Sequence, residues 1–145
     1  MYTIGKTSAL TGLPISTLRY YDREGLFPDL ERVSGIRQFS DKEIEIIRVI
    51  ECLKRSGLGI KDIKQFMQWS IMGSETFEIR KNLFENQRRV IEKELEDINR
   101  VHSMLDFKCW YYETAIKLGS EFLVEELIPE RLPQNILESY NKSHK

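Results

Sequence analysis

The sequence predicts a mainly α-helical protein with a winged helix-turn-helix head, one long helix and a short C-terminal tail. Near the N-terminus, two short helical stretches are separated by a glycine turn. A Ser-Gly turn between apolar residues follows them. Residues 75–118 then contain neither Gly nor Pro and repeat apolar side chains every seven positions. These features predict a head over residues 1–70, the long helix over 75–118 and the tail over 119–145.

Composition is typical of a globular chain. The 145 residues are 41% hydrophobic and 31% charged, which is too apolar for a disordered protein of net charge −1. No apolar run approaches the roughly 18 residues of a membrane span, and the first residues lack the pattern of a secretory signal. Two cysteines are too few for a disulfide scaffold and have no zinc-finger spacing. We therefore expect a cytoplasmic protein with reduced thiols and with no metal, cofactor or membrane contact.

The first two predicted helices have the lengths and the turn of a helix-turn-helix. Thr3 is a good N-cap for a helix that Gly12 ends, and Pro14 suits the start of a second helix that Gly25 ends. The second helix carries hydroxyl, arginine and tyrosine side chains, which can reach phosphates and base edges. An ordinary helical hairpin with a solvated face has the same spacing. DNA binding and a plain helical hairpin both stay open on this evidence.

Net charge does not favour a generic polycation. The total is −1, with a small basic excess before residue 69 and an acidic excess after it. Because affinity for nucleic acid depends on neutralising phosphates, any DNA binding must rest on particular residues of the first half.

The rest of the head predicts a small wing and two more helices. Residues 27–39 favour a two-stranded hairpin around Ser34-Gly35. Ser40 and Glu43 form a capping box for the third helix, and a fourth helix ends near Trp69. The expected core stripe of these two helices comprises Ile46, Ile47, Val49, Ile50, Leu53, Ile63, Phe66 and Met67.

Residues 70–74 are expected to break the chain before the long helix. The seven-residue repeat then runs through Phe77, Phe84, Ile91, Ile98, Leu105 and Tyr112. At about 1.5 Å per residue this helix is over 60 Å long, more than the head can cover. The repeat therefore predicts self-association as a coiled coil, with a helix folded back on the head as the alternative.

Several runs of the head closely resemble the MerR family of transcription regulators. They are Thr3-Ile4-Gly5, Thr11-Gly12 and the run from Thr17-Leu18-Arg19-Tyr20-Tyr21 through Asp22-Arg23-Glu24-Gly25-Leu26, with Arg32, Gly35, Arg37 and Phe39 in the wing. The resemblance covers about residues 2–69, and residues 75–118 fit the family's antiparallel dimerisation helix. Ile36 and Phe39 stand where tyrosines are common. Phe39 has no hydroxyl for a phosphate contact.

The resemblance implies a homodimer that binds and distorts double-stranded promoter DNA so that RNA polymerase can engage. It places the second helix in the major groove, with Arg19 as the main base reader and phosphate contacts from the wing and the fourth helix. The implied DNA-binding residues are Ser16, Thr17, Arg19, Tyr20, Arg37 and Lys61. A helix N-terminus favours an anion by itself, and Lys61 adds to that effect.

The signal that the protein senses is inferred by comparing the chain with the branches of this family. Metal-sensing relatives have cysteines where this chain reads Ser74-Glu75-Thr76-Phe77, and no cysteine follows Cys109. Drug-binding relatives carry a large ligand domain, which the residues after Leu118 are too few to form. A branch of the family that responds to aldehydes and other thiol-reactive electrophiles has a cysteine at a position similar to Cys52, and this chain resembles that branch in length.

Cys52 is the candidate sensing residue. On a helical projection it lies roughly 130° from the apolar stripe of its helix, beside Arg48 and Arg55. Nearby guanidinium charge favours the reactive thiolate, and Glu45 partly offsets it. The alternative is a small side chain packed against the partner's long helix.

Three other interpretations remain. Cys109 lies within Phe107-Lys108-Cys109-Trp110-Tyr111-Tyr112, whose three consecutive aromatic residues cannot all face one seam. A noncovalent ligand near Trp110 is therefore an alternative to dimer or tail packing. An enzyme is not expected, because only two histidines and no catalytic motif are present. A coiled-coil adaptor that does not bind DNA would leave residues 17–21 and the wing without a purpose.

Overall fold

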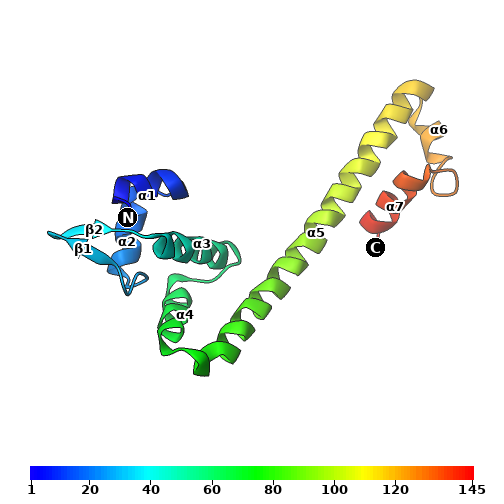
Figure 1. Ribbon diagram of the computed structural model, residues 1–145. Helices are drawn as coiled ribbons and strands as arrows, with labels where there is room; N and C mark the ends of the chain where they lie inside the picture. The colour runs from blue at the N-terminus through cyan, green and yellow to red at the C-terminus, as the bar shows by residue number, and fades with distance from the viewer. The chain divides into compact units, whose positions relative to one another are not determined.

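The structure is a computed structural model that describes residues 1–145 and divides them into two compact units (Figure 1). The first unit comprises residues 1–90 and the second residues 91–145. The long helix α5 (Phe77–Leu118) begins in the first unit and continues into the second. The predicted fold class is confirmed, since the chain is mainly helical with an N-terminal winged helix-turn-helix and one long helix.

The helix-turn-helix consists of α1 (Ile4–Thr11) and α2 (Ile15–Arg23). The Thr3 hydroxyl accepts a hydrogen bond from the Lys6 amide and caps α1. Gly12 ends α1 in the left-handed conformation, at φ 75°. Local sequence signals therefore set the ends of the first helix and the turn into the second.

The wing is a hairpin of β1 (Glu31–Val33) and β2 (Ile36–Gln38). Ser34 and Gly35 both have positive φ, at 50° and 76°. A two-residue loop of this kind matches the twist of the flanking strands and fixes their register. As a result, Arg32 lies directly opposite Arg37, and Val33 opposite Ile36.

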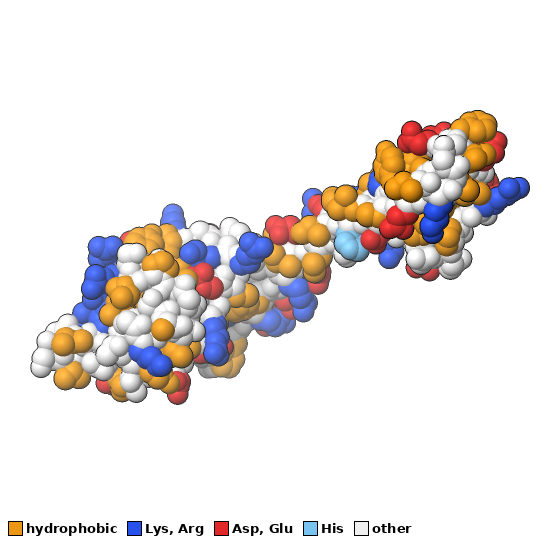
Figure 2. Space-filling model, turned by 90° about the horizontal axis from the view of Figure 1, so that it is seen from above, with side chains coloured by type: hydrophobic (Ala, Val, Ile, Leu, Met, Phe, Trp, Pro, Cys, Tyr) orange, Lys and Arg blue, Asp and Glu red, His pale blue; other side chains and the backbone are white.

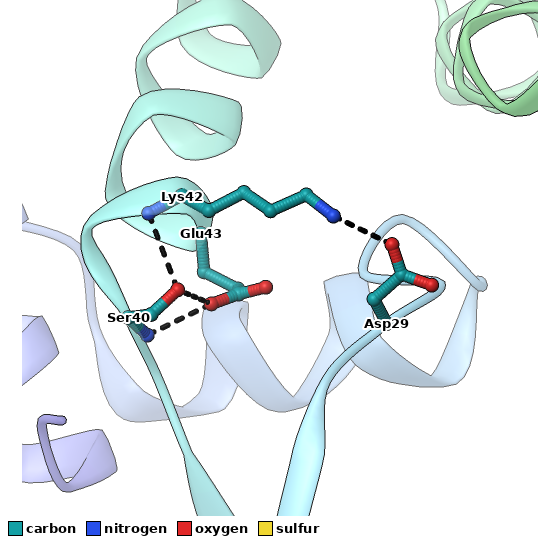
Figure 3. Close-up of polar contacts among 4 residues, drawn as sticks. All are labelled: Asp29, Ser40, Lys42 and Glu43. Atoms are coloured by element: carbon teal, nitrogen blue, oxygen red, sulfur yellow. Dashed lines mark hydrogen bonds and ion pairs between the residues drawn. The ribbon is translucent and has the colours of Figure 1, made fainter.

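Helices α3 (Asp41–Arg55) and α4 (Ile60–Met72) complete the head. The capping box of α3 forms as predicted: the Ser40 amide donates to the Glu43 carboxylate at 2.8 Å, and the Lys42 amide donates to the Ser40 hydroxyl at 3.2 Å (Figure 3). Lys42 Nζ also reaches Asp29 at 2.6 Å, which ties the start of α3 to the loop before the wing (Figure 3).

The expected break at residues 70–74 is wrong in extent. Helix α4 continues to Met72, and within it the Ser70 hydroxyl donates a hydrogen bond to the Phe66 carbonyl one turn back. The turn is made by Gly73, at φ 86°, and by the short helix η1 (Ser74–Thr76). Only a glycine readily adopts the backbone conformation that this reversal needs.

The core of the head contains most of the predicted residues and several aromatic ones. Its fully or nearly buried side chains are Leu18, Tyr21, Leu26, Phe27, Phe39, Ile47, Ile50, Leu53, Ile63, Phe66 and Met67. Phe39 is therefore a core residue, in edge contact with Phe27, and its lack of a hydroxyl removes no DNA contact. Ile46 and Val49, expected in the core, are only half-buried because they line an open groove of about 650 Å³ between α3 and α4.

The second unit has a small core of its own. Helices α6 (Glu121–Glu125) and α7 (Gln134–Ser143) follow α5. Their Val124 and Ile136 pack with Phe107 and Tyr111 of α5. The expected packing of some aromatic side chains on the tail is therefore observed.

Much of the apolar stripe of α5 remains exposed in this single chain. Leu95, Ile98, Val101 and Leu105 are each exposed by more than half, from 53% to 62%. Although α5 has 42 residues, neither it nor any other helix is apolar enough over a sufficient length to cross a membrane. The stripe is instead typical of a helix that packs against another helix.

Candidate nucleic-acid interface

Helix α2 presents one polar face to solvent and one apolar face to the core. Leu18 and Tyr21 are buried, while Ser16, Arg19 and Tyr20 are exposed. Thr17 is half-buried at the edge of that face. Of the six residues expected to contact DNA, the four on α2 therefore lie together on the outer side of the second helix.

The inner face of α2 is tied to α3 through Tyr21. Its hydroxyl donates to the Glu51 carboxylate at 2.6 Å, and Lys54 Nζ donates to the same hydroxyl at 2.7 Å. Burial and the hydrogen bond to Glu51 raise the pKa of Tyr21, against an opposing effect of Lys54. The neutral hydroxyl is thus able to donate and accept at once, and it fixes the rotation of α2 about its axis.

The outer end of α2 is tied to the wing through Asp22. Its Oδ2 atom lies 2.5 Å from a terminal nitrogen of Arg32 and 2.7 Å from Nε of Arg37. The two arginines are directly opposite in the hairpin, where like charges repel each other. The Asp22 side chain is only 12% exposed, so water screens this contact little, and the carboxylate joins both strands to α2.

This arrangement adds detail to the predicted phosphate contact of Arg37. Its Nε is used by Asp22, and its two terminal nitrogens make no other hydrogen bond within the chain. They are available for a phosphate, and the cluster of one carboxylate and two guanidinium groups keeps one net positive charge. Arg37 stays a predicted phosphate contact, now held in place by Asp22.

Lys61 lies where the sequence predicts it, in the first turn of α4. It is exposed, and no side chain caps the helix start at Gly59. The first backbone amides of α4 are therefore open to an external anion beside the ammonium group of Lys61. Asp62, the next residue, is the acidic side chain of the same first turn.

Cys52 is exposed on α3, as expected from its angle to the apolar stripe. Arg48 pairs with Glu45 at 3.1 Å, so one of the two expected arginines is already engaged. Cys52 also follows Glu51 and precedes Lys54, the residues that hold Tyr21. The thiol thus lies within one helical turn of the contact that anchors α2.

The second cysteine lies in the other unit. Cys109 is exposed beside a shallow cavity of about 420 Å³, which Trp110 and Pro133 also line. His102 Nδ1 lies 3.3 Å from an Asp106 carboxylate oxygen, one turn further along α5.

Sequence reasoning missed the roles of Asp22 and Arg32. One signal for them is present, because a two-residue turn at Ser34-Gly35 fixes Arg32 opposite Arg37. Two facing arginines repel each other, so an acidic partner on the same side of the hairpin stabilises them. The Tyr21–Glu51–Lys54 contact has no comparable local signal, since it joins residues 30 or more positions apart.

A helix-turn-helix with an exposed polar second helix, clamped to an arginine-bearing wing, defines a winged helix-turn-helix DNA-binding protein. Residues 2–69 match the family described as "MerR HTH family regulatory protein". Together with the relatives below, this match shows that the chain belongs to the MerR family of transcription regulators.

Two curated relatives and one solved structure extend the match beyond the head. An uncharacterised HTH-type transcriptional regulator of Haemophilus influenzae is 38% identical over 120 residues, which is 82% of this chain and 89% of the relative. The HTH-type transcriptional regulator AdhR of Bacillus subtilis is 37% identical over 91 residues, 61% of this chain and 65% of the relative. The crystal structure of HiNmlR, a MerR family regulator lacking the sensor domain and bound to promoter DNA, superposes with a TM-score of 0.70 at 37% identity. It covers 84% of this chain and 98% of HiNmlR.

Proposed function

We propose that this MerR-family regulator acts in the cytoplasm as a homodimer that binds and distorts a promoter and responds to an electrophile such as an aldehyde. The similar HiNmlR is a promoter-binding protein without a sensor domain, and its structure matches nearly the whole of that chain.

The observation that carries the DNA-binding proposal is the double anchoring of α2. Tyr21 fixes one side of the helix to α3, and Asp22 fixes the other to the wing. Ser16, Arg19 and Tyr20 then project from a rigid element, as base and phosphate readout requires. In this proposal, Arg37 and Lys61 contact phosphates on either side of the groove that α2 enters.

The dimer proposal rests on the exposed stripe of α5. Four apolar side chains along α5, Leu95, Ile98, Val101 and Leu105, are more than half exposed within one chain. An antiparallel partner helix would cover them, and it would set the separation of two recognition helices on the DNA. A change in that separation would alter the twist of the promoter for RNA polymerase.

The electrophile proposal rests on the place of Cys52. The thiol is exposed, and it lies within one turn of Glu51 and Lys54, which hold the buried Tyr21 of α2. An adduct on this turn would add volume beside the anchor of the recognition helix. Because Cys52 is exposed in the single chain, this effect requires that the partner's long helix packs against the same turn in the dimer. Such a packed contact tolerates added atoms poorly, so the adduct would shift the head between discrete arrangements.

Transcription from a defined promoter tests the function. A duplex is selected by the wild-type protein from a random-sequence pool and placed between promoter elements, and RNA polymerase is added with and without methylglyoxal. We expect binding to that duplex, a change of transcript level with protein, and a further change with the aldehyde that Cys52→Ser abolishes. Cys109→Ser is the matched control and should respond normally.

The second candidate signal has its own observation, the cavity beside Trp110 and Cys109. If Cys52→Ser responds fully to the aldehyde, the thiol mechanism is wrong, and a noncovalent ligand at this cavity becomes the better explanation. If the protein selects no duplex, the regulator function itself is wrong for this chain.

A further inference from the structure

The chain turns sharply between α4 and α5 (Figure 1), and side chains just before and within α5 cap the end of α4. The last carbonyl groups of a helix have no partner within it. Here the Thr76 hydroxyl donates to the Trp69 carbonyl at 2.6 Å, and a terminal nitrogen of Arg80 donates to the Gly73 carbonyl at 2.8 Å. Arg80 Nε also donates to the Thr76 hydroxyl at 3.0 Å. Arg80 thus ties the first turn of α5 to the end of α4, where a positive charge is favourable.

Two further contacts join the same face of α5 to the head. Phe84 packs edge-on against Phe66 of α4, with ring centroids 5.3 Å apart. Gln87 Nε2 donates to the carbonyl and to the hydroxyl of Ser56 at the end of α3, at 2.9 and 3.1 Å. Ser56 is itself buried. Positions 80, 84 and 87 are four and three residues apart, so they lie on one face of the helix.

The first three turns of α5 are therefore fixed to the head at three places. Contacts to the end of α4, to its middle and to the end of α3 set both the direction of α5 and its rotation within the head. The compact unit of residues 1–90 accordingly includes this part of α5. Further along α5, hydrophobic side chains are exposed between charged ones (Figure 2), and Ile98 and Leu105 among them are proposed dimer contacts.

We infer that Arg80 and Gln87 are positioning residues for promoter distortion, because they make the joint between the head and the dimer helix stiff enough to impose the geometry of the dimer on DNA. This inference rests on the proposed function, since it requires a dimer through α5 and a distorted promoter. Twisting or bending a duplex costs free energy. A head on a loose joint would turn to follow the relaxed duplex, and the protein would then bind without distorting it.

A duplex with a flexible centre tests this inference. The wild-type protein selects a duplex from a random-sequence pool, and a second version of it receives two mismatched base pairs midway between the half-sites. The mismatches keep the length and the charge of the duplex but lower the cost of deforming it. We expect the wild type to bind the mismatched duplex about tenfold more tightly than the intact one. It should also change the fluorescence energy transfer between dyes at the two ends of the intact duplex.

The variant Arg80→Ala with Gln87→Ala should bind the two duplexes about equally, because its heads no longer enforce the distortion. It should lose most of the change in energy transfer on the intact duplex. Asn86→Ala with Arg89→Ala is the matched control, since it removes one amide and one arginine from the same turns. Arg89 and Asn86 are both exposed and bond to each other at 2.7 Å. This control should keep the preference of the wild type.

A milder variant covers the case in which the double variant does not fold. Gln87→Glu keeps the shape of the side chain, but its carboxylate cannot donate to the Ser56 carbonyl. It should show a smaller preference for the mismatched duplex than the wild type does, at unchanged dimer mass in light scattering.

Two outcomes would overturn the inference. A folded double variant could keep the wild-type preference and energy transfer, or Gln87→Glu could keep both when the double variant does not fold. Equal losses of affinity for the two duplexes count as a kept preference, since they indicate a role in DNA contact or stability alone. A wild type that selects no duplex, or that neither prefers the mismatched duplex nor changes the energy transfer, fails at the proposed function instead.

Discussion

Arg37 Nε donates to Asp22 Oδ2 at 2.7 Å, so the second strand of the wing is held to the last turn of α2. The same oxygen accepts from Arg32 on the facing strand. An acidic side chain on the part of the head that we propose to face DNA opposes phosphate binding by its charge. Asp22 has a positioning role here, because its carboxylate orients the guanidinium groups of Arg32 and Arg37 and ties the wing to α2.

Replacing Asp22 should therefore have opposite effects on specific and nonspecific binding. Asp22→Ala removes a negative charge, so affinity for random DNA should rise slightly. Affinity for the selected duplex should fall, because the wing is no longer fixed to α2, and the specific-to-nonspecific ratio should drop about tenfold. Fluorescence anisotropy on both duplexes measures this. Glu31→Gln, an equal charge change on the wing without an ion pair, should leave the ratio unchanged.

Replacing Arg19 and replacing Lys61 should affect DNA binding in two different ways. Arg19→Ala is expected to cost about 1–3 kcal/mol on the selected duplex and to relax the base preference at the contacted pair. Lys61→Ala should weaken every sequence alike and lower the slope of log affinity against log salt by about one. Titrations at several salt concentrations separate the two. Unchanged affinity and preference after Arg19→Ala would contradict the placement of α2 in the major groove.

The dimer should depend on the exposed stripe of α5. Ile98→Asp with Leu105→Asp places two charges in each half of the expected seam, where desolvating them is costly. Light scattering should show the wild type at twice the chain mass of 17.2 kDa and the double variant at the single mass. Asn99→Asp, one residue away on a polar position, should stay dimeric. A monomeric wild type at micromolar concentration rules out this dimer.

Adducts on the two cysteines should have different effects on DNA binding. Both are exposed, so both should be alkylated. Only the adduct on Cys52 should change binding to the selected duplex, because it lies within a turn of the residues that hold Tyr21. Mass spectrometry of modified single-cysteine variants, paired with anisotropy, checks this. Equal effects of the two adducts would argue against a role of Cys52.

The second unit should lose stability at high pH through Tyr111. Its hydroxyl donates to Glu125, and burial together with the carboxylates of Glu121 and Glu125 raises its pKa to about 12. The folded state therefore favours the neutral phenol. The resulting stabilisation is complete below the ordinary pKa of 10 and is lost as pH rises from 10 towards about 12.

Fluorescence of Trp110 in a Trp69→Phe background reports on that unit. Its unfolding temperature should fall more steeply above pH 10 in the Tyr111 protein than in Tyr111→Phe, which keeps the ring but cannot ionise. Identical pH profiles would show that Tyr111 does not contribute. The comparison between the two proteins cancels the titration of lysines, which occurs in the same range.

The sequence by itself determined the helix-turn-helix, the wing and the long helix, because their signals are local. Thr3 and Gly12 set the ends of α1, Ser40 and Glu43 cap α3, and Ser34-Gly35 allows only a tight hairpin. Each of these contacts joins residues a few positions apart, so the pattern of residue types specifies it. The family resemblance of the head depends on the same segments.

The tertiary structure alone decided which side chains act together. Asp22 meets arginines 10 and 15 positions away, and Tyr21 meets Glu51 and Lys54 across two helices. Phe39 became core and Ile46 did not, although both are apolar residues in predicted elements. Burial and pairing at these places depend on how separate elements pack against one another. That packing minimises exposed apolar area and satisfies buried polar groups over the whole head, which no local pattern encodes.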